Sequence, residues 1–176
     1  MASVFTHAAV GAALGAAFHR KGDGARFWVL GCLCAALPDV DAIGFFAGIP
    51  YASAFGHRGF THSLLFAALV AAGLSWRLFK RDWRIGLYLF AATASHGVLD
   101  AMTNGGLGVG FFIPFSEGRY FFPWRPIAVS PIGISKFFHG RGLAVMASEL
   151  QWVWLPSALF AIAVSGGRKM ISRSAP

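Results

Sequence analysis

The chain has 176 residues, of which 56% are hydrophobic and only 12% are charged, and its mean hydropathy is +0.61. Because soluble domains usually carry about 25% charged residues, this composition excludes an ordinary soluble protein and predicts a single membrane-embedded domain over residues 1–176. The net charge of +8 would suit nucleic acid, but the basic residues lie in short segments between apolar runs. That pattern is typical of membrane topology, so no nucleic-acid partner is expected.

The first predicted helix covers residues 4–18, which are rich in Ala and Gly and carry no Asp, Glu, Lys or Arg. Gly11 and Gly15 stand four residues apart, the spacing that lets helices pack closely in a membrane. His7 lies near the start of this helix. A lone His on an apolar helix is more often a hydrogen-bonded packing residue than a ligand, so His7 by itself does not indicate a site.

Two acidic residues follow the second apolar run. Residues 27–37 end at Pro38, and Asp39 and Asp41 come directly after it. Pro disfavours a helical backbone at the residue before it, so we expect the two acids on an extended or turning backbone. Side chains at i and i+2 then point the same way, and adjacent carboxylates repel unless a cation or a proton lies between them. The alternative is an ordinary Asp turn at a helix end.

The densest group of polar residues is the hexapeptide 57–62. It holds His57, Arg58 and His62 immediately before the next apolar helix, which is predicted over residues 63–79. Metal sites use neutral imidazole nitrogen, and only six His residues occur in the whole chain, so two in one hexapeptide favour a metal site. The alternative is that a Thr or Ser of this stretch caps the helix and the His residues merely occupy the loop.

A further helix, residues 85–102, carries His96 and Asp100 four positions apart, which places both side chains on one face. Ionisable groups inside an apolar helix are costly and are by default functional, although a His–Asp hydrogen bond within the bundle is the alternative. Residues 103–142 are expected to form a long loop, and connections of this length are usually functional. The last helix is predicted over residues 143–164.

The distribution of basic residues predicts which loops lie on which side. The turn after the first helix, the connection before residue 85 and the C-terminal tail hold three, four and three of the 15 Lys and Arg residues. The positive-inside rule places these segments in the cytoplasm and residues 41–62 and 103–142 outside. The helix directions then bring seven candidate ligands to the outer side. They are His7, Asp39, Asp41, His57, His62, His96 and Asp100.

Seven nitrogen and oxygen ligands exceed the needs of one four-coordinate ion, so two or more ions are expected. Mixed His and carboxylate ligation without thiolate suits Zn²⁺, with Mn²⁺ or Fe²⁺ as alternatives. Such ions activate water and polarise a phosphoryl or acyl oxygen. Asp39 is the expected catalytic carboxylate, and Arg58 and Arg119 could pair with a substrate phosphate through their fork geometry. Contact with anionic lipid headgroups is the alternative for the two arginines.

Several of these motifs together resemble the membrane-bound metal-dependent hydrolase family, which includes LexA-regulated inner-membrane proteins. The resemblance rests on His7 with Gly11, residues 38–41, residues 57–63, residues 95–103, and residues 114–116 with Arg119. The family is distantly similar to zinc-dependent phospholipase C, an all-helical enzyme with a cluster of zinc ions, which implies phosphoester hydrolysis. Two departures stand out: Asn104 replaces an expected Pro, and Glu149 lacks the His partner used by the phospholipase.

The expected architecture is an all-α helical membrane bundle of about four to five apolar helices in the bacterial inner membrane, with a metal site at its outer face. The expected function is hydrolysis of a lipid or lipid-linked phosphoester by metal-activated water, with the lipid bilayer itself as the surrounding partner. The alternative is a non-enzymatic membrane protein that binds or transports a divalent metal. Transport would need polar groups that reach the cytoplasmic side, and the inner halves of these helices offer almost none.

Overall fold

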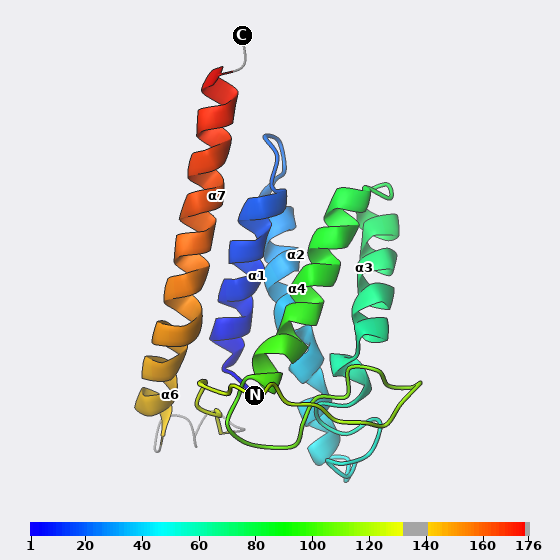
Figure 1. Cartoon of the computed structure of the whole chain (residues 1–176). Helices are drawn as coiled ribbons and strands as arrows, with labels where there is room; N and C mark the ends of the chain where they lie inside the picture. Colours follow the sequence, from blue (N-terminus) through cyan, green and yellow to red (C-terminus); the bar gives the residue numbers. More distant parts are fainter. Residues whose placement is uncertain (132–140, 175–176) are drawn as a thin grey trace.

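Apolar stretches of the chain fold as long helices that stand side by side (Figure 1). The structure is a computed structural model, and it describes residues 1–131 and 141–174. The described part is all-helical, as predicted. Its long helices are α1 (Val4–Phe18), α2 (Ala25–Ala36), α3 (Leu64–Leu78), α4 (Trp83–Ala101) and a final rod made of α6 (Gly142–Glu149), the π-helical turn η3 (Leu150–Trp154) and α7 (Leu155–Ser174).

Polar side chains cap the start of three helices. The Ser63 hydroxyl accepts a hydrogen bond from the Phe66 amide at the start of α3, and the Asp82 carboxylate accepts one from the Arg84 amide at the start of α4. Ser3 stands at the same position before α1. Each cap satisfies an amide that the helix itself leaves unpaired, typically stabilising the helix by about 1 kcal/mol. These local signals explain why the predicted boundaries of these three helices agree closely with the structure.

Glycines allow α1, α2 and α4 to approach one another closely. A Cβ atom added to Gly31 would lie 1.7 Å from the Tyr88 hydroxyl oxygen, and one added to Gly11 would lie 2.7 Å from the Gly31 carbonyl oxygen. The Tyr88 hydroxyl donates to the Gly11 carbonyl at 3.0 Å. Phe27 and Leu89 complete the buried cluster around it. The close packing predicted from the Gly11–Gly15 spacing is therefore confirmed.

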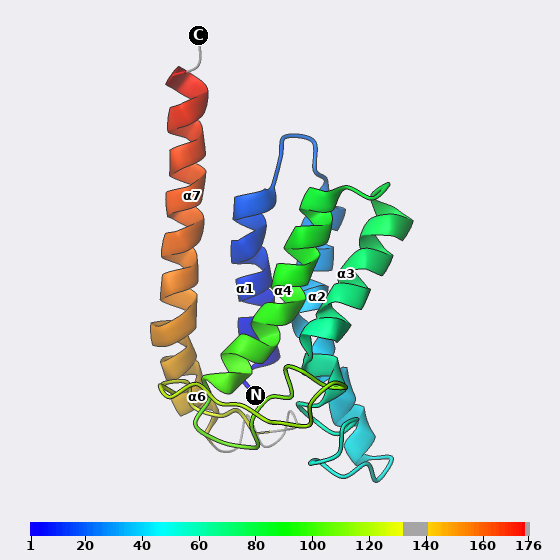
Figure 2. The ribbon, with the colours of Figure 1, turned by 45° about the vertical axis from the view of Figure 1, so that its right-hand side comes forward.

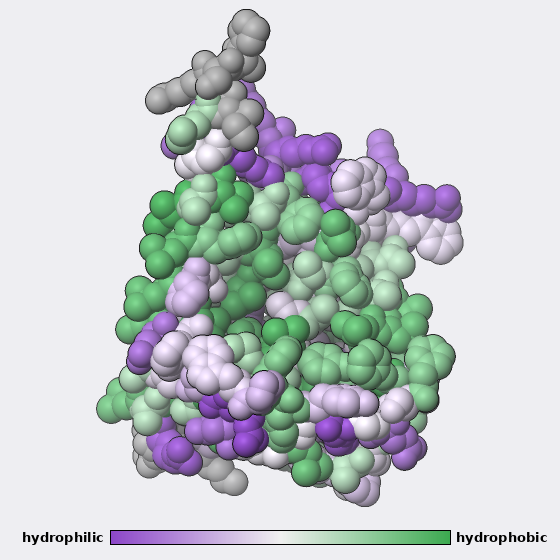
Figure 3. Space-filling view, in the orientation of Figure 1, coloured by the Kyte–Doolittle hydropathy of each residue, from purple (hydrophilic) through white to green (hydrophobic). Residues whose placement is uncertain are grey.

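The surface has the character of a membrane protein. Figure 3 shows a broad hydrophobic band with hydrophilic residues gathered toward the two ends. The segments Ala25–Phe45 and Gly142–Met170 are long and apolar enough to cross a membrane, and α1 and α3 are shorter apolar helices. Large apolar side chains on these helices are exposed, for example Leu33, Leu69 and Ile162. Exposure of this kind is favourable where acyl chains replace water.

The backbone after Pro38 differs from the expectation. Leu37 has helical angles (φ −57°, ψ −39°), and residues Leu37–Phe45 form the 3₁₀-helix η1, with Pro38 at its first positions. Pro is well placed there because the first turn of a helix needs no amide donor. We expected an extended or turning backbone; the extended form was wrong, and its consequence fails too. In a helix of three residues per turn, side chains at i and i+2 diverge, so Asp39 and Asp41 face different partners.

The final rod also extends beyond its predicted end. The helix continues to Ser174, so basic residues assigned to a tail lie on α7. The Arg168 guanidinium donates to the Ala16 and His19 carbonyls at 2.9 and 2.6 Å. An ion pair of 2.8 Å joins Arg84 to Asp23. The three basic segments therefore meet at one end of the bundle, opposite the long loop (Figure 2). Which end faces the cytoplasm stays a prediction.

Candidate metal centre

Four side chains from three elements converge at the end of the bundle that carries the long loop. Asp39 comes from η1, His62 from the short 3₁₀-helix η2 (Phe60–His62), and His96 and Asp100 from the last two turns of α4. One ligand atom from each lies within 4.8 Å of all the others. The i, i+4 spacing on α4 brings His96 and Asp100 to the same face, as predicted. We call these four residues the first group.

The first group contains buried polar atoms that have no hydrogen-bond partner among the described residues. They are Nε2 of His62, Nε2 of His96 and both carboxylate oxygens of Asp39. Leaving one such atom buried and unpaired costs about 1–3 kcal/mol. Several lone pairs that converge on one small volume are explained at once by a shared cation. The donor set, imidazole and carboxylate without thiolate, suits a divalent transition metal.

His7 joins the first group from α1. Its Nε2 lies 3.6 Å from Asp100 Oδ1, and its ring stacks on that of His96 with centroids 3.6 Å apart. The side chain is fully buried, and neither of its nitrogens has a hydrogen-bond partner in the described part of the chain. His7 is therefore placed as a possible fifth ligand, and the packing role that a lone His usually has does not account for its unpaired nitrogens.

The second ring nitrogen, Nδ1, of His96 and of His62 contacts a neighbouring group outside the first group. His96 Nδ1 donates to the Ala35 carbonyl at 2.7 Å, which leaves its Nε2 free as a lone pair. His62 Nδ1 lies 3.2 Å from Asp41 Oδ2 and 3.1 Å from the Thr61 hydroxyl. Hydrogen bonds of this kind fix the tautomer and orientation of metal-binding imidazoles. Both rings thus present Nε2 to the centre of the first group.

Asp41, His57 and His62 form a second group whose ligand atoms also lie within 4.8 Å of one another. Its atoms already have partners. His57 Nδ1 lies 2.6 Å from Asp41 Oδ1, and Asp41 Oδ2 accepts from the Thr61 hydroxyl at 2.6 Å and from the Arg58 amide at 3.2 Å. The sequence suggested Asp41 and His57 as direct ligands. The structure places them behind His62, where they can orient its ring.

Arg58 is placed differently from the expected contact with a substrate. Its side chain is 0% exposed. Nε donates to Asp100 Oδ2 at 3.0 Å, and the terminal nitrogens donate to the Gly105 and Leu107 carbonyls and to the Thr103 hydroxyl. Four of the five N–H groups of a guanidinium are thereby used. The position fits a residue that orients Asp100 and fastens the following loop, rather than one that meets phosphate.

Arg119 also serves the loops. Its terminal nitrogens donate to the carbonyls of His57, Gly108, Tyr51 and Ser53, at 2.9–3.3 Å. Its half-buried side chain therefore joins residues 51–57 to the loop that follows α4. A contact with substrate phosphate would have to replace several of these bonds, so the geometry favours an anchoring role for Arg119 as well.

Glu149 supports the site through its hydrogen bonds, a role that its sequence position did not predict. It is fully buried at the end of α6. Its carboxylate accepts from the Ser3 amide and hydroxyl at 2.5 and 2.6 Å and from the Thr6 hydroxyl at 2.8 Å. The Trp154 indole donates to the same Thr6 oxygen. These bonds fix the first turn of α1, which carries His7. The sequence does contain a signal for Glu149, because an ionisable residue in an apolar membrane helix is by default functional.

Removing the Asp41 carboxylate should weaken metal binding without removing a direct ligand. We expect Asp41→Asn to lower the affinity of the purified protein for Zn²⁺ by about 10–100-fold, because the His62 ring then faces a neutral amide instead of the carboxylate that orients it. A competition titration with a fluorescent zinc chelator measures this loss. Glu117→Gln is the matched control, since it removes an exposed acid from the same end of the bundle. Equal affinities in the two variants would show that Asp41 does not support the site.

The comparisons with known proteins agree with the membrane character of the structure. Residues 1–171 match the family described as YdjM inner membrane protein. One relative, the inner membrane protein YbcI of Escherichia coli (strain K12), is 42% identical over 164 residues, which cover 90% of this chain and 94% of the relative. No solved structure matches the chain. The chain therefore belongs to the YdjM family of inner membrane proteins.

Proposed function

We propose that this protein is a membrane-bound metal-dependent hydrolase that cleaves a phosphoester in a lipid or lipid-linked substrate. The observation that carries the proposal is the convergence of unpartnered Nε2 and carboxylate oxygen atoms from His62, His96 and Asp39 in a buried volume. His96 Nε2 and Asp39 Oδ1 lie 3.2 Å apart, and both are acceptors because His96 Nδ1 already donates to the Ala35 carbonyl, so they repel unless a cation or a proton lies between them. Resemblance to the membrane-bound metal-dependent hydrolases supports the same reaction class.

The first group would hold one ion, with His7 as an additional ligand. Zn²⁺ is the ion we propose, because imidazole and carboxylate donors without thiolate suit it, and Mn²⁺ or Fe²⁺ are the alternatives. When bound, such an ion supplies Lewis-acid activation of water and of a phosphoryl oxygen. The second group could hold another ion only if the short bond between His57 and Asp41 gave way. We therefore propose that the second group orients His62.

Asp39 is the residue that we propose to move a proton. Its side chain is 10% exposed, whereas the side chains of His62, His96 and Asp100 are 0% exposed, so a substrate approaching from outside meets Asp39 first. Both of its oxygens lack a hydrogen-bond partner in the described residues. One oxygen can bind the ion while the other accepts a proton from the attacking water. The closed surroundings keep bulk water away and strengthen these electrostatic interactions.

The alternative function, metal binding or transport, has weaker structural support. A transported ion would need polar groups between the first group and the opposite end of the bundle. The buried cluster between α1, α2 and α4 there is built from Phe27, Tyr88, Leu89 and Ala92, and the Tyr88 hydroxyl is committed to the Gly11 carbonyl. This apolar core favours a site that works from one side.

An assay of lipid turnover distinguishes a hydrolase from a protein that only binds or transports metal. Protein loaded with Zn²⁺ is incubated in liposomes with a broad lipid panel, and products are identified by mass spectrometry. We expect wild type to release a phosphoester product and Asp39→Asn to lower the rate at least 100-fold, a loss typical of general acid–base residues. Glu117→Gln should keep the wild-type rate. If zinc-loaded wild type leaves every lipid intact, the hydrolase proposal fails and the binding function takes its place.

A further inference from the structure

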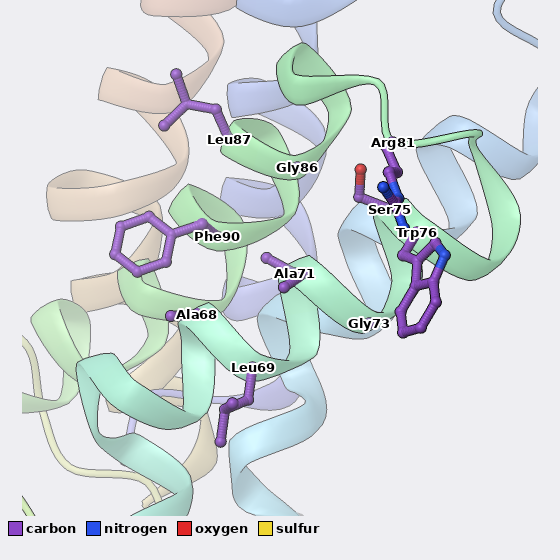
Figure 4. A pocket seen from close by; sticks show the side chains of 11 residues that line it. Ala68, Leu69, Ala71, Gly73, Ser75, Trp76, Arg81, Gly86, Leu87 and Phe90 are labelled. Carbon is purple, nitrogen blue, oxygen red and sulfur yellow. The ribbon is translucent and has the colours of Figure 1, made fainter.

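A groove opens between α3 and α4 on the side of the bundle (Figure 4). It has a volume of about 770 Å³. Many of the residues that line it are small, so the two helices leave an open groove between them. Figure 4 shows this groove, with Trp76 and Arg81 near one end of it. The main small and apolar lining residues are Ala68, Ala72, Gly73, Gly86, Leu87 and Phe90.

The groove faces the surroundings of the bundle. Leu69, Trp76 and Leu87 on its rim are 57%, 68% and 47% exposed, and an inner membrane protein presents such side chains to acyl chains. A Cβ atom added to Gly73 would meet nothing within 4 Å, which shows open space in this part of the groove. A bilayer leaves no such space empty. A lipid chain is the occupant that an apolar, open-sided channel of this shape admits.

The end of the groove that lies next to Trp76 is positively charged. Arg77, Lys80 and Arg81 are all exposed there. The Arg81 guanidinium lies 5.4 Å from the centre of the Trp76 ring, and no carboxylate of the described residues forms an ion pair with it. The nearest acid in sequence, Asp82, is paired with Arg84 at 3.2 Å. Trp is typical of the membrane–water interface, so the charge sits at the depth of lipid headgroups. Basic pockets between membrane helices bind anionic headgroups.

We propose that the groove between α3 and α4 binds one anionic phospholipid, with an acyl chain along Gly73 and Gly86 and the phosphate beside Arg81. A second copy of the chain fits less well, because a symmetric contact would set two positive ends against each other. The site is distinct from the metal centre. Arg81 precedes α4, whereas Asp100 lies at the far end of that 19-residue helix, about 25 Å away by its rise per residue. The bound lipid is therefore a structural partner and not the substrate.

Quenching of Trp76 fluorescence by brominated lipids tests the proposal. The full-length protein is placed in phosphatidylcholine vesicles that contain either brominated phosphatidylglycerol or brominated phosphatidylcholine. The contribution of Trp76 is the difference between wild type and Trp76→Phe. We expect the anionic lipid to quench Trp76 at about a fivefold lower mole fraction than the zwitterionic lipid, the preference that one basic residue near the surface provides.

Three variants assign the preference to the groove. Arg81→Gln should abolish the preference for the anionic lipid. Gln would keep the left-handed backbone that Arg81 has (φ 62°), so the substitution removes the charge alone. Gly73→Leu should also abolish the preference by filling the channel. Lys21→Gln, which removes an exposed charge from the first turn, should keep it. Equal quenching by the two lipids, or a preference that survives Arg81→Gln or Gly73→Leu, would overturn the proposal. So would shielding of Trp76 from both lipids together with a dimeric mass, because a second copy would then fill the groove.

Discussion

His62→Ala and Asp100→Ala should each purify with at least 100-fold weaker zinc affinity than wild type, whereas His19→Ala should bind zinc normally. Each of the first two variants removes a donor that lies within 4.8 Å of the other donors of the first group. Loss of a direct ligand costs more than the 10–100-fold that is typical of an orienting residue. His19 instead caps the opposite end of α1, where its ring lies 5.1 Å from that of Trp28.

Elemental analysis of detergent-purified protein, followed by chelator competition, measures this effect. Equal metal content in His62→Ala, Asp100→Ala and His19→Ala would refute the first group as the metal centre. His139, the remaining histidine expected to be dispensable, lies outside the described residues. The controls make the result specific, because all three variants lose one polar side chain, yet only two of them lose a residue of the first group.

The same titration should depend on pH in a defined direction. His62 ends the short helix η2 just before α3, and it lies outside the two candidate membrane spans. Burial lowers its pKa, but the neighbouring carboxylates of Asp100 and Asp41 outweigh this effect and raise the pKa to about 9 without metal. A metal needs the deprotonated nitrogen, so binding must release this proton at neutral pH. Zinc affinity should therefore rise about tenfold per pH unit up to about pH 9, and a flat profile between pH 6.5 and 7.5 would contradict this ligand.

Arg58→Met should destabilise the fold by about 3–5 kcal/mol, because it removes the closest cation from the buried Asp100 carboxylate and leaves the Gly105 and Leu107 carbonyls without this donor. Both Arg58 and Asp100 are fully buried, and their 3.0 Å contact joins Arg58 to the first group. Arg58→Lys should recover only part of the loss, since a single ammonium cannot reach Asp100 and the Gly105 and Leu107 carbonyls together. The free energy of unfolding in detergent, measured in the metal-free protein, is the appropriate quantity.

The matched control for Arg58 is Lys21→Met, which replaces an exposed cation and should change the unfolding free energy by less than about 0.5 kcal/mol. This experiment also decides between two roles for Arg58. If Arg58→Met folds as stably as wild type but loses lipid turnover, then Arg58 contacts the substrate, as the sequence suggested. A large loss of stability supports the anchoring role that the buried guanidinium indicates.

The sequence by itself determined the helices, the membrane environment and most of the residues at the centre. These features depend on short-range properties. A helix such as residues 64–78 follows from an apolar run behind the Ser63 cap, and His96 and Asp100 share a face because helical geometry sets their spacing. Counting basic residues between helices predicted that His62 and Asp100 lie at the same end. The structure brings all seven candidate residues into one connected set of contacts, while their roles as ligands stay proposals.

Only the tertiary structure decided which of these residues face the centre and which stand behind it. The direction of Asp41 depends on the 3₁₀-helix after Pro38 and on the hydroxyl of Thr61, 20 residues away. The burial of Arg58 depends on Asp100, 42 residues away. The contact between Glu149 and Ser3 joins residues 146 positions apart. No local pattern encodes such contacts, because they arise from how whole helices pack, and packing selects which polar groups lose water and must find partners.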